Sequence, residues 1–220
     1  MLTKEILAKM IDHSLLNPSI SDKDLEEGCK KAVEYDVFSV CVKPYHIKKA
    51  VSLLTGSGIS VITVIGFPHG SNLTSVKVYE TELALKEGAV EFDMVINIGA
   101  LKSGGKEFVL EDIKSVVKSA EGRIVKVILE NCYLTDEEKI LGCKIAMDSG
   151  AQFVKTSTGY GSGGAILEDV ILMKKVVGDN VKIKAAGGIR SFELAKKFIY
   201  AGASRLGTTR TDVILKEFQE

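Results

Sequence analysis

Charged side chains interrupt several apolar, β-rich runs of this 220-residue sequence, and three of them are suited to carbonyl chemistry. Asp93, Lys155 and Lys184 each have apolar neighbours in the chain. Because alternate side chains of a barrel strand face the interior, charged residues two positions apart share the inner face. Glu91 and Asp93 show this spacing, as do Lys182 and Lys184. The pattern predicts a barrel with a charged interior.

Two lysines close together favour one particular reaction. A lysine with a pKa near 10.4 is neutral in only about one molecule in 2,500 at pH 7. A second ammonium and an apolar site both disfavour the charged form, which frees an amine to attack a carbonyl and form a Schiff base. The protonated imine then accepts electrons from an adjacent carbon–carbon bond. For a lysine considered alone, a snorkelling side chain or a core ion pair is the alternative interpretation. Lys126 and Glu130, which also share one strand face, strengthen the functional interpretation as a set.

The histidines do not indicate a metal site. His13, His46 and His69 lie in separate segments and show neither the H-x-H nor the H-E-x-x-H spacing. We therefore expect no metal and no cofactor, and a metal-dependent aldolase is disfavoured.

Glycine-rich segments follow the last three expected strands, each ahead of an expected helix. Backbone N–H groups at such turns bind anions, and barrels often hold phosphate after strands seven and eight. Glycine in a loop more often serves simple turn geometry, so a single cluster is a weak signal. The expected substrate and phosphate contacts are Gly159, Gly187, Gly188, Gly207 and Thr208.

The elements that must position these residues form a regular alternation. Gly-Ala pairs at 88–89, 150–151 and 202–203 follow helical patterns and precede β-rich runs, as expected of helix caps. Residues 1–9 indicate a leading helix, and Thr135 with Glu138 predicts a capping box. Eight strands are expected near 10–15, 37–42, 60–66, 91–96, 124–130, 152–156, 181–185 and 203–206.

Eight strands alternating with helices leave two architectures, a closed barrel and an open doubly wound sheet. One expected crossover helix has Ile166, Val170, Met173 and Val177 on one face. No G-x-G-x-x-G follows the first strand, so the dinucleotide-binding open sheet lacks its usual signature. We predict a single-domain α/β protein over residues 1–220, a (β/α)8 TIM barrel with a short extra N-terminal helix.

Composition excludes several classes of partner. Lys plus Arg and Asp plus Glu both number 29, which leaves no electrostatic footprint for nucleic acid or membrane. The four cysteines show no C-x-x-C pair, and free thiols together with the absence of an N-terminal apolar core favour a cytoplasmic protein. The expected partner is a small phosphosugar; a homo-oligomer, dimer or tetramer, is open.

Four ordered motifs resemble the deoxyribose-phosphate aldolase family, from Asp12 to about Arg210. They are Asp12-His13-Ser14-Leu15-Leu16, the run from Glu91 to Gly99, the run from Phe153 to Gly159, and the run from Val181 to Arg190.

The resemblance implies reversible cleavage of 2-deoxy-D-ribose 5-phosphate to D-glyceraldehyde 3-phosphate and acetaldehyde. It assigns the imine to Lys155, its perturbation and a share of proton transfer to Lys184, and proton donation and acceptance to Asp93. Asp12 resembles a member of the supporting polar network.

The chain departs from the family pattern at Ser14, Ala186 and Thr209-Arg210. Arg210 either strengthens the anion site or faces solvent. Two alternatives stay open: another Schiff-base barrel enzyme, such as a transaldolase-like protein, and a noncatalytic barrel that binds a phosphorylated metabolite.

Overall fold

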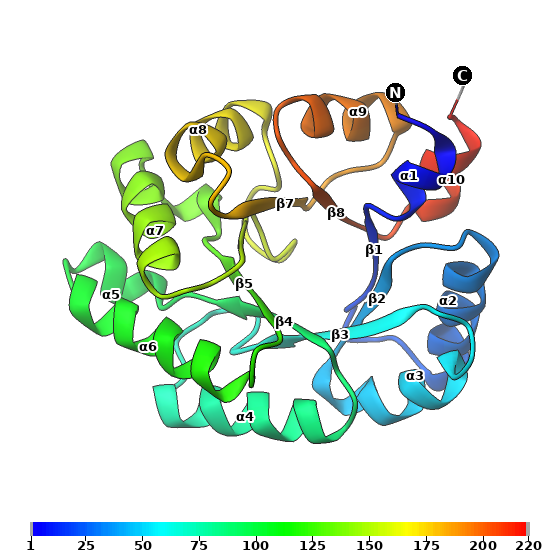
Figure 1. The fold of residues 1–220 in the computed structure, drawn as a ribbon, viewed down its shortest axis with the longest axis horizontal. Helices are drawn as coiled ribbons and strands as arrows, with labels where there is room; N and C mark the ends of the chain where they lie inside the picture. Colours follow the sequence, from blue (N-terminus) through cyan, green and yellow to red (C-terminus); the bar gives the residue numbers. More distant parts are fainter. Residues whose placement is uncertain (1, 219–220) are drawn as a thin grey trace.

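The computed structural model describes residues 2–218, and within them eight parallel strands close into a barrel surrounded by helices (Figure 1). Each strand pairs with the next in the sequence, and the last pairs with the first. The predicted (β/α)8 barrel is therefore confirmed. The strands are β1 (Ile11–Leu15), β2 (Ser39–Val42), β3 (Ser60–Ile65), β4 (Glu91–Val95), β5 (Ile124–Ile128), β6 (Phe153–Lys155), β7 (Lys182–Ala186) and β8 (Arg205–Thr208).

The helices form the outer layer of the barrel. They are α1 (Lys4–Ala8), α2 (Asp22–Glu34), α3 (Ile47–Leu54), α4 (Thr74–Lys86), α5 (Ile98–Lys102), α6 (Lys106–Ser119), α7 (Asp136–Asp148), α8 (Leu167–Val177), α9 (Phe192–Tyr200) and α10 (Thr211–Lys216), with short 3₁₀ turns η1 (Pro44–His46) and η2 (Asn131–Tyr133).

Local sequence signals set the helix boundaries as expected. Thr135 and Glu138 form the predicted capping box at the start of α7. Gly88, Gly150 and Gly202 have φ of 103°, 82° and 113°, the left-handed region in which glycine ends a helix without a Cβ clash. These turns return the chain to the bottom of the barrel after α4, α7 and α9.

Some predicted boundaries were wrong. Strand β5 ends at Ile128 rather than at residue 130, because Glu130 takes a left-handed conformation with φ of 56°. Ile166 precedes α8 as its N-cap residue and is exposed, so it does not share the buried face of Val170 and Met173. The extra N-terminal helix is confirmed as Lys4–Ala8, and residue 1 of the predicted 1–9 helix lies outside the described residues.

The apolar core lies between the sheet and the helices. Phe92 and Met94 of β4, Val125 and Val127 of β5, and Leu206 of β8 are fully buried in it. The opposite face of these strands carries charged side chains into the barrel, in keeping with the alternation expected of a strand. Apolar packing thus fixes the strands while leaving the barrel interior to polar groups.

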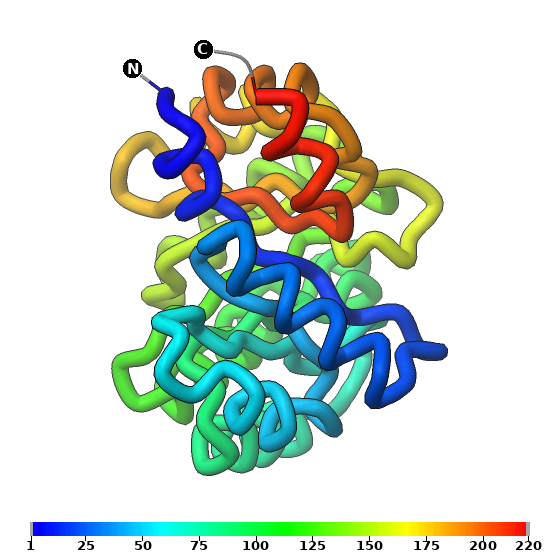
Figure 2. Tube along the Cα trace, turned by 90° about the vertical axis from the view of Figure 1, so that its right-hand side faces the viewer, coloured from blue at the N-terminus to red at the C-terminus, as the bar shows by residue number. Residues whose placement is uncertain are grey.

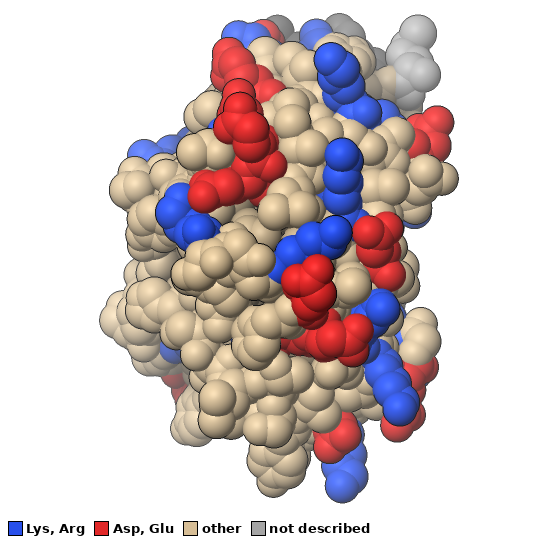
Figure 3. Space-filling model, turned by 90° about the vertical axis from the view of Figure 1, so that its left-hand side faces the viewer, with Lys and Arg blue, Asp and Glu red and all other residues tan. Residues whose placement is uncertain are grey.

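The two ends of the described chain lie side by side, with α1 next to α10 in both ribbon and tube views (Figures 1 and 2). On the face formed by α5, α6 and α7, acidic and basic side chains are interspersed (Figure 3). Among residues 2–218, no helix combines the length and the apolar character needed to cross a bilayer.

Candidate active site

Charged side chains from β4 and β5 meet inside the barrel, as the spacing predicted. Glu91 and Asp93 both point inward, and Lys126 of β5 bridges them. Its Nζ lies 2.6 Å from Glu91 Oε2 and 2.7 Å from Asp93 Oδ1. The register of the two strands causes this contact, because Asp93 pairs with Lys126 in the ladder.

The two predicted lysines share one carboxylate oxygen. Asp93 Oδ2 lies 2.8 Å from Lys155 Nζ and 2.7 Å from Lys184 Nζ. Lys155 and Lys184 are directly opposite one another on β6 and β7, which places both ammonium groups on the same level of the barrel. Both side chains and Asp93 are almost fully buried.

Asp12 completes this group from β1. Its Oδ2 accepts a hydrogen bond from Lys184 Nζ, and its Oδ1 accepts from Ser39 Oγ at 2.6 Å and from Arg205 Nη1 at 2.7 Å. Lys184 therefore contacts two carboxylates, whereas Lys155 contacts one oxygen that it must share.

This difference separates the two lysines electrostatically. Burial lowers the pKa of Lys155 below its ordinary value, and the Lys184 ammonium acts in the same direction against the attraction of Asp93. Burial also acts to lower the pKa of Lys184, but attraction to Asp12 and Asp93 outweighs it and raises that pKa. The two shifts are opposite in direction, so Lys155 gives up its proton more readily than Lys184 does.

The carboxylates remain charged despite burial. For Asp93, burial acts to raise the pKa, but Lys126, Lys155 and Lys184 together hold it well below its ordinary value. Lys184, Lys126 and Arg205 likewise overcome the effect of burial and lower the pKa of Asp12. Asp93 is therefore ionised in the resting site.

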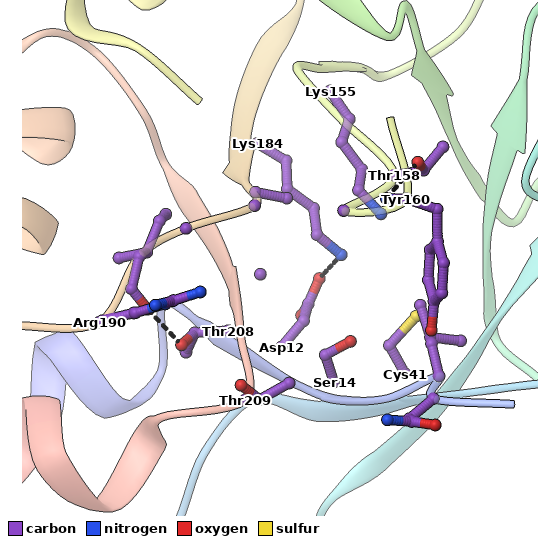
Figure 4. A pocket seen from close by; sticks show the side chains of 18 residues that line it. Asp12, Ser14, Cys41, Lys155, Thr158, Tyr160, Lys184, Arg190, Thr208 and Thr209 are labelled. Atoms are coloured by element: carbon purple, nitrogen blue, oxygen red, sulfur yellow. Dashed lines mark hydrogen bonds and ion pairs between the residues drawn. The ribbon is translucent and has the colours of Figure 1, made fainter. Parts of the chain in front are cut away.

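A cavity of about 420 Å³ opens onto these groups at the carboxyl ends of the strands. Figure 4 shows Lys155 and Lys184 between two walls: Arg190, Thr208 and Thr209 on one side, Thr158, Tyr160 and Cys41 on the other. Asp93 lies beneath the cavity and reaches it through the two lysines. The lining residues are Asp12, Ser14, Leu16, Asn17, Cys41, Lys155, Thr158, Gly159, Tyr160, Lys184, Ala186, Gly187, Gly188, Ile189, Arg190, Gly207, Thr208 and Thr209.

Two glycine-rich loops approach each other closely at the cavity wall. A Cβ on Gly164 would lie 2.4 Å from the carbonyl oxygen of Gly187, so no side chain fits there. Ala165 N donates to that same oxygen at 3.0 Å. Thr208 Oγ1 donates to Ile189 O at 2.7 Å and accepts from Arg210 N at 2.9 Å, which joins the loops after β7 and β8.

The structure brings together nearly all of the expected site residues, with three exceptions among the charged ones. Lys182 starts β7 at its amino end and is exposed, so it does not belong to the charged interior. Arg210 is exposed and does not line the cavity, whereas Arg190 does. Glu130 is buried but lies beyond β5, where it accepts hydrogen bonds from Thr158 N and Oγ1.

Arg205 is the residue that the sequence interpretation missed. It stands at the start of β8, points inward and contacts both Asp12 and Glu91. Its position two residues before Gly207 in an expected strand follows the same alternation that identified Lys184. Cys41, in contrast, lines the cavity but is inert, since burial raises the pKa of its thiol to about 11.

Within residues 2–218, no group of three or more His, Cys, Asp or Glu side chains is arranged to hold a metal ion. His13 instead faces away from the cavity and lies 2.8 Å from Thr211 Oγ1. The carboxylates inside the barrel are engaged by lysine and arginine.

The fold and the site together define a (β/α)8-barrel enzyme with paired lysines at the carboxyl ends of its strands. The family model described as DeoC/LacD family aldolase matches residues 6–208, and the chain belongs to this family.

Relatives are similar in sequence over nearly the whole chain. The deoxyribose-phosphate aldolases of Carboxydothermus hydrogenoformans and Dictyoglomus turgidum are 55% and 53% identical to it. The matches cover 95% and 92% of this chain and 93% of each relative. A tetrameric deoxyribose phosphate aldolase from Aeropyrum pernix is similar in structure, with a TM-score of 0.91 and 32% identity over 97% of this chain and 91% of that one.

Proposed function

We propose that this protein is a 2-deoxy-D-ribose 5-phosphate aldolase that cleaves its substrate reversibly through a Schiff base on Lys155. The observation that carries the proposal is the unequal pairing of the two lysines over one cavity. Lys184 contacts the carboxylates of both Asp12 and Asp93, whereas Lys155 contacts one oxygen of Asp93, which Lys184 also contacts. Enzymes of this name from two organisms are 55% and 53% identical in sequence to the chain, which supports the proposal.

The first steps use Lys155 as a nucleophile. Its neutral Nζ attacks the C1 aldehyde of the open-chain sugar, and loss of water gives a protonated imine. Lys184, which remains an ammonium within reach of the same oxygen of Asp93, donates the proton that the departing hydroxyl needs. The cavity in which we place the sugar is lined by both lysines.

Cleavage then requires a base for the C3 hydroxyl. Asp93, charged in the resting site, accepts that proton directly or through Lys184. The C2–C3 bond breaks, its electrons move into the imine, and glyceraldehyde 3-phosphate leaves. Protonation of the enamine at C2 by the same groups, followed by hydrolysis, releases acetaldehyde and restores Lys155.

The phosphate belongs, in this proposal, at the wall formed by the loops after β6, β7 and β8. Gly159, Gly187, Gly188 and Gly207 leave backbone atoms open to the cavity, and Arg190 supplies positive charge. The hydroxyl of Thr208 already joins two loops, so its contribution is the backbone N–H. Asp12 supports the site through Lys184.

The wider setting is part of the same proposal. We place the enzyme in the cytoplasm, in carbohydrate degradation, as a single domain over residues 1–220; its four free cysteines suit a reducing compartment. A homo-oligomer, dimer or tetramer, is supported by the apolar residues Val76, Tyr79 and Leu83 exposed on α4 and by the tetramer of the relative from Aeropyrum pernix.

Borohydride trapping tests the function. Protein incubated with deoxyribose 5-phosphate and reduced should carry an adduct on the peptide that contains Lys155, found by mass spectrometry, with or without a chelator. Lys155→Ala should abolish the adduct. Lys182→Ala is the matched control, because this lysine is exposed on β7, outside the site. Folded wild-type protein that forms no adduct and releases no acetaldehyde would refute the proposal.

A further inference from the structure

Six buried charges inside the barrel form a closed, alternating ring, here called the charge ring. Each cation of the ring contacts two of its carboxylates, and each carboxylate contacts two of its cations. The order around the ring is Asp12, Arg205, Glu91, Lys126, Asp93 and Lys184, and then Asp12 again.

Three members of the ring, Glu91, Lys126 and Arg205, lie away from the cavity. Lys126 and Arg205 meet at Glu91, whose Oε2 lies 2.6 Å from Lys126 Nζ and 3.3 Å from Arg205 Nη1. None of these three side chains lines the cavity. Arg205 is further fixed by the ring of Phe38, 3.6 Å from its guanidinium carbon.

The charge ring is balanced without Lys155. Its three carboxylates face three cations, so a proton on Lys155 adds a positive charge that has no carboxylate of its own. Lys155 contacts the ring at one atom, Asp93 Oδ2, which Lys184 already uses. Burial without a compensating carboxylate disfavours the ammonium form of a lysine and favours its neutral amine.

We propose that Glu91, Lys126 and Arg205 are positioning residues that set the charge state of Lys155. They complete a ring that has no net charge, so a proton on the neighbouring Lys155 is the one positive charge in excess. This inference rests on the proposed function for its biological meaning. It goes beyond that function by assigning the control of the nucleophile to three side chains that never touch substrate.

The consequence is a rule of sign. Removal of a cation from the ring leaves a net negative charge beside Lys155, which stabilises the ammonium and moves its titration to higher pH. Removal of a carboxylate leaves a net positive charge and moves the titration to lower pH. Removal of one of each restores the balance. A residue that merely supports the fold does not produce shifts of opposite sign.

The other groups around Lys155 do not disturb this rule. Cys41 on β2 stays a neutral thiol, since burial raises its pKa. Asp12 of β1, Asp93 of β4 and Lys184 of β7 are members of the ring. The same burial lowers the pKa of Lys155, as an unbalanced cation requires.

The test measures the titration of Lys155 in four proteins: wild type, Lys126→Met, Glu91→Gln and the double variant. Reductive methylation with formaldehyde and cyanoborohydride over a range of pH, with peptide mass mapping, reports the free amine without any substrate. The pH dependence of kcat/KM for deoxyribose 5-phosphate is measured in parallel. Circular dichroism at each pH confirms that the barrel is folded.

Lys126→Met should shift the methylation curve and the rising limb of kcat/KM by about one pH unit to higher pH. Glu91→Gln should shift both by a similar amount to lower pH, and the double variant should return close to wild type. If Lys126→Met does not fold, Lys126→Gln or the acid shift of Glu91→Gln decides the question.

Shifts of the same sign in both single variants, or a lower kcat with unmoved curves, would overturn the inference. Failure of the proposed function has a different signature: opposite methylation shifts accompanied by no cleavage of deoxyribose 5-phosphate in wild type. In that case the charge control would hold for a site with another substrate.

Discussion

Buried ion pairs occur in two regions of this protein, inside the barrel and in the helical layer, and the two differ in stoichiometry. In the layer, Lys77 of α4 pairs with Asp112 of α6 at 2.5 Å, and both side chains are fully buried. Lys77 Nζ also donates to Val95 O, and Asp112 accepts from Thr74 Oγ1. The ammonium and both carboxylate oxygens there have partners, and neither residue lines the cavity above Lys155.

Inside the barrel, Asp93 contacts three lysines, and the positive charge of one of them, Lys155, has no carboxylate of its own. The difference teaches that buried charge by itself does not mark a site, because the helical layer has it too. A site is marked by buried charge that is unequally shared and opens onto a cavity. Lys155 meets both conditions, and Lys77 meets neither.

The comparison predicts opposite outcomes for two lysine-to-methionine changes, of which Lys155→Met has the larger effect. Loss of the nucleophile should lower kcat by at least roughly 10⁴-fold, as for other covalent catalysts. The free energy of unfolding should be unchanged or higher, by about 1–3 kcal/mol, because a buried polar amine without a carboxylate of its own is replaced by an apolar group. Aldolase assays and urea unfolding at pH 7 measure the two quantities.

A Lys155→Met protein that is clearly less stable than wild type would contradict this account, since it would mean that the amine holds the fold together. Lys155→Arg provides a control for charge. It keeps a permanent cation at the same place, so it should lose both activity and stability.

Lys77→Met should show the reverse pattern. It leaves Asp112 charged and without its partner in the helical layer, which should cost about 3–5 kcal/mol of unfolding free energy. The value of kcat at 25 °C should change little, because the pair lies outside the cavity.

The double variant Lys77→Met/Asp112→Leu sharpens this second prediction. It removes both charges, so the unfolding free energy should recover most of the loss. A fall in kcat that persists in the stabilised double variant would show that the pair also shapes the site through Val95, the last residue of β4.

Sequence periodicity was sufficient for the inner face but not for the pairing on it. Asp93, Lys155 and Lys184 were correctly placed together, since the period of two in a strand fixes which side each residue takes. The same rule gave the wrong result at Lys182, because it does not tell how far along the barrel axis a residue lies. Register between strands decides that, and register depends on long-range packing.

The loops were predicted less completely than the strands. The glycines of the cavity wall were expected, but the approach of Gly164 to Gly187 joins loops more than twenty residues apart and leaves no local signal. Arg210 was weighed for the anion site, whereas Arg190 lines the cavity. Arg205 was overlooked because its partners, Asp12 and Glu91, come from strands far away in the sequence.

The third prediction concerns two adjacent residues of β1, one facing the barrel interior and the other facing the helical layer. Asp12 faces the charge ring, where cations keep it ionised. His13 faces the helical layer, where burial lowers its pKa to about 4, with Lys31 acting in the same direction. The inner face of the strand therefore stabilises a charged side chain, whereas the outer face favours the neutral form of His13.

The lowered pKa of His13 should appear as a pH dependence of the free energy of unfolding. An unfolded histidine binds a proton near pH 6.5, whereas folded His13 does so only near pH 4, so the unfolded state binds more protons between these values. His13 therefore contributes stability that is present above about pH 6.5 and is lost as the pH falls toward 4, by up to about 3 kcal/mol.

Urea unfolding of wild type and His13→Gln between pH 7 and pH 4 measures this loss. The variant should be less stable at pH 7, since it loses the contact with Thr211, but its stability should fall less on acidification. His46 and His69, unchanged in both proteins, cancel in the comparison. An equal acid dependence in the two proteins would mean that His13 is protonated without cost, and that the helical layer accepts a single buried charge as readily as the barrel interior does.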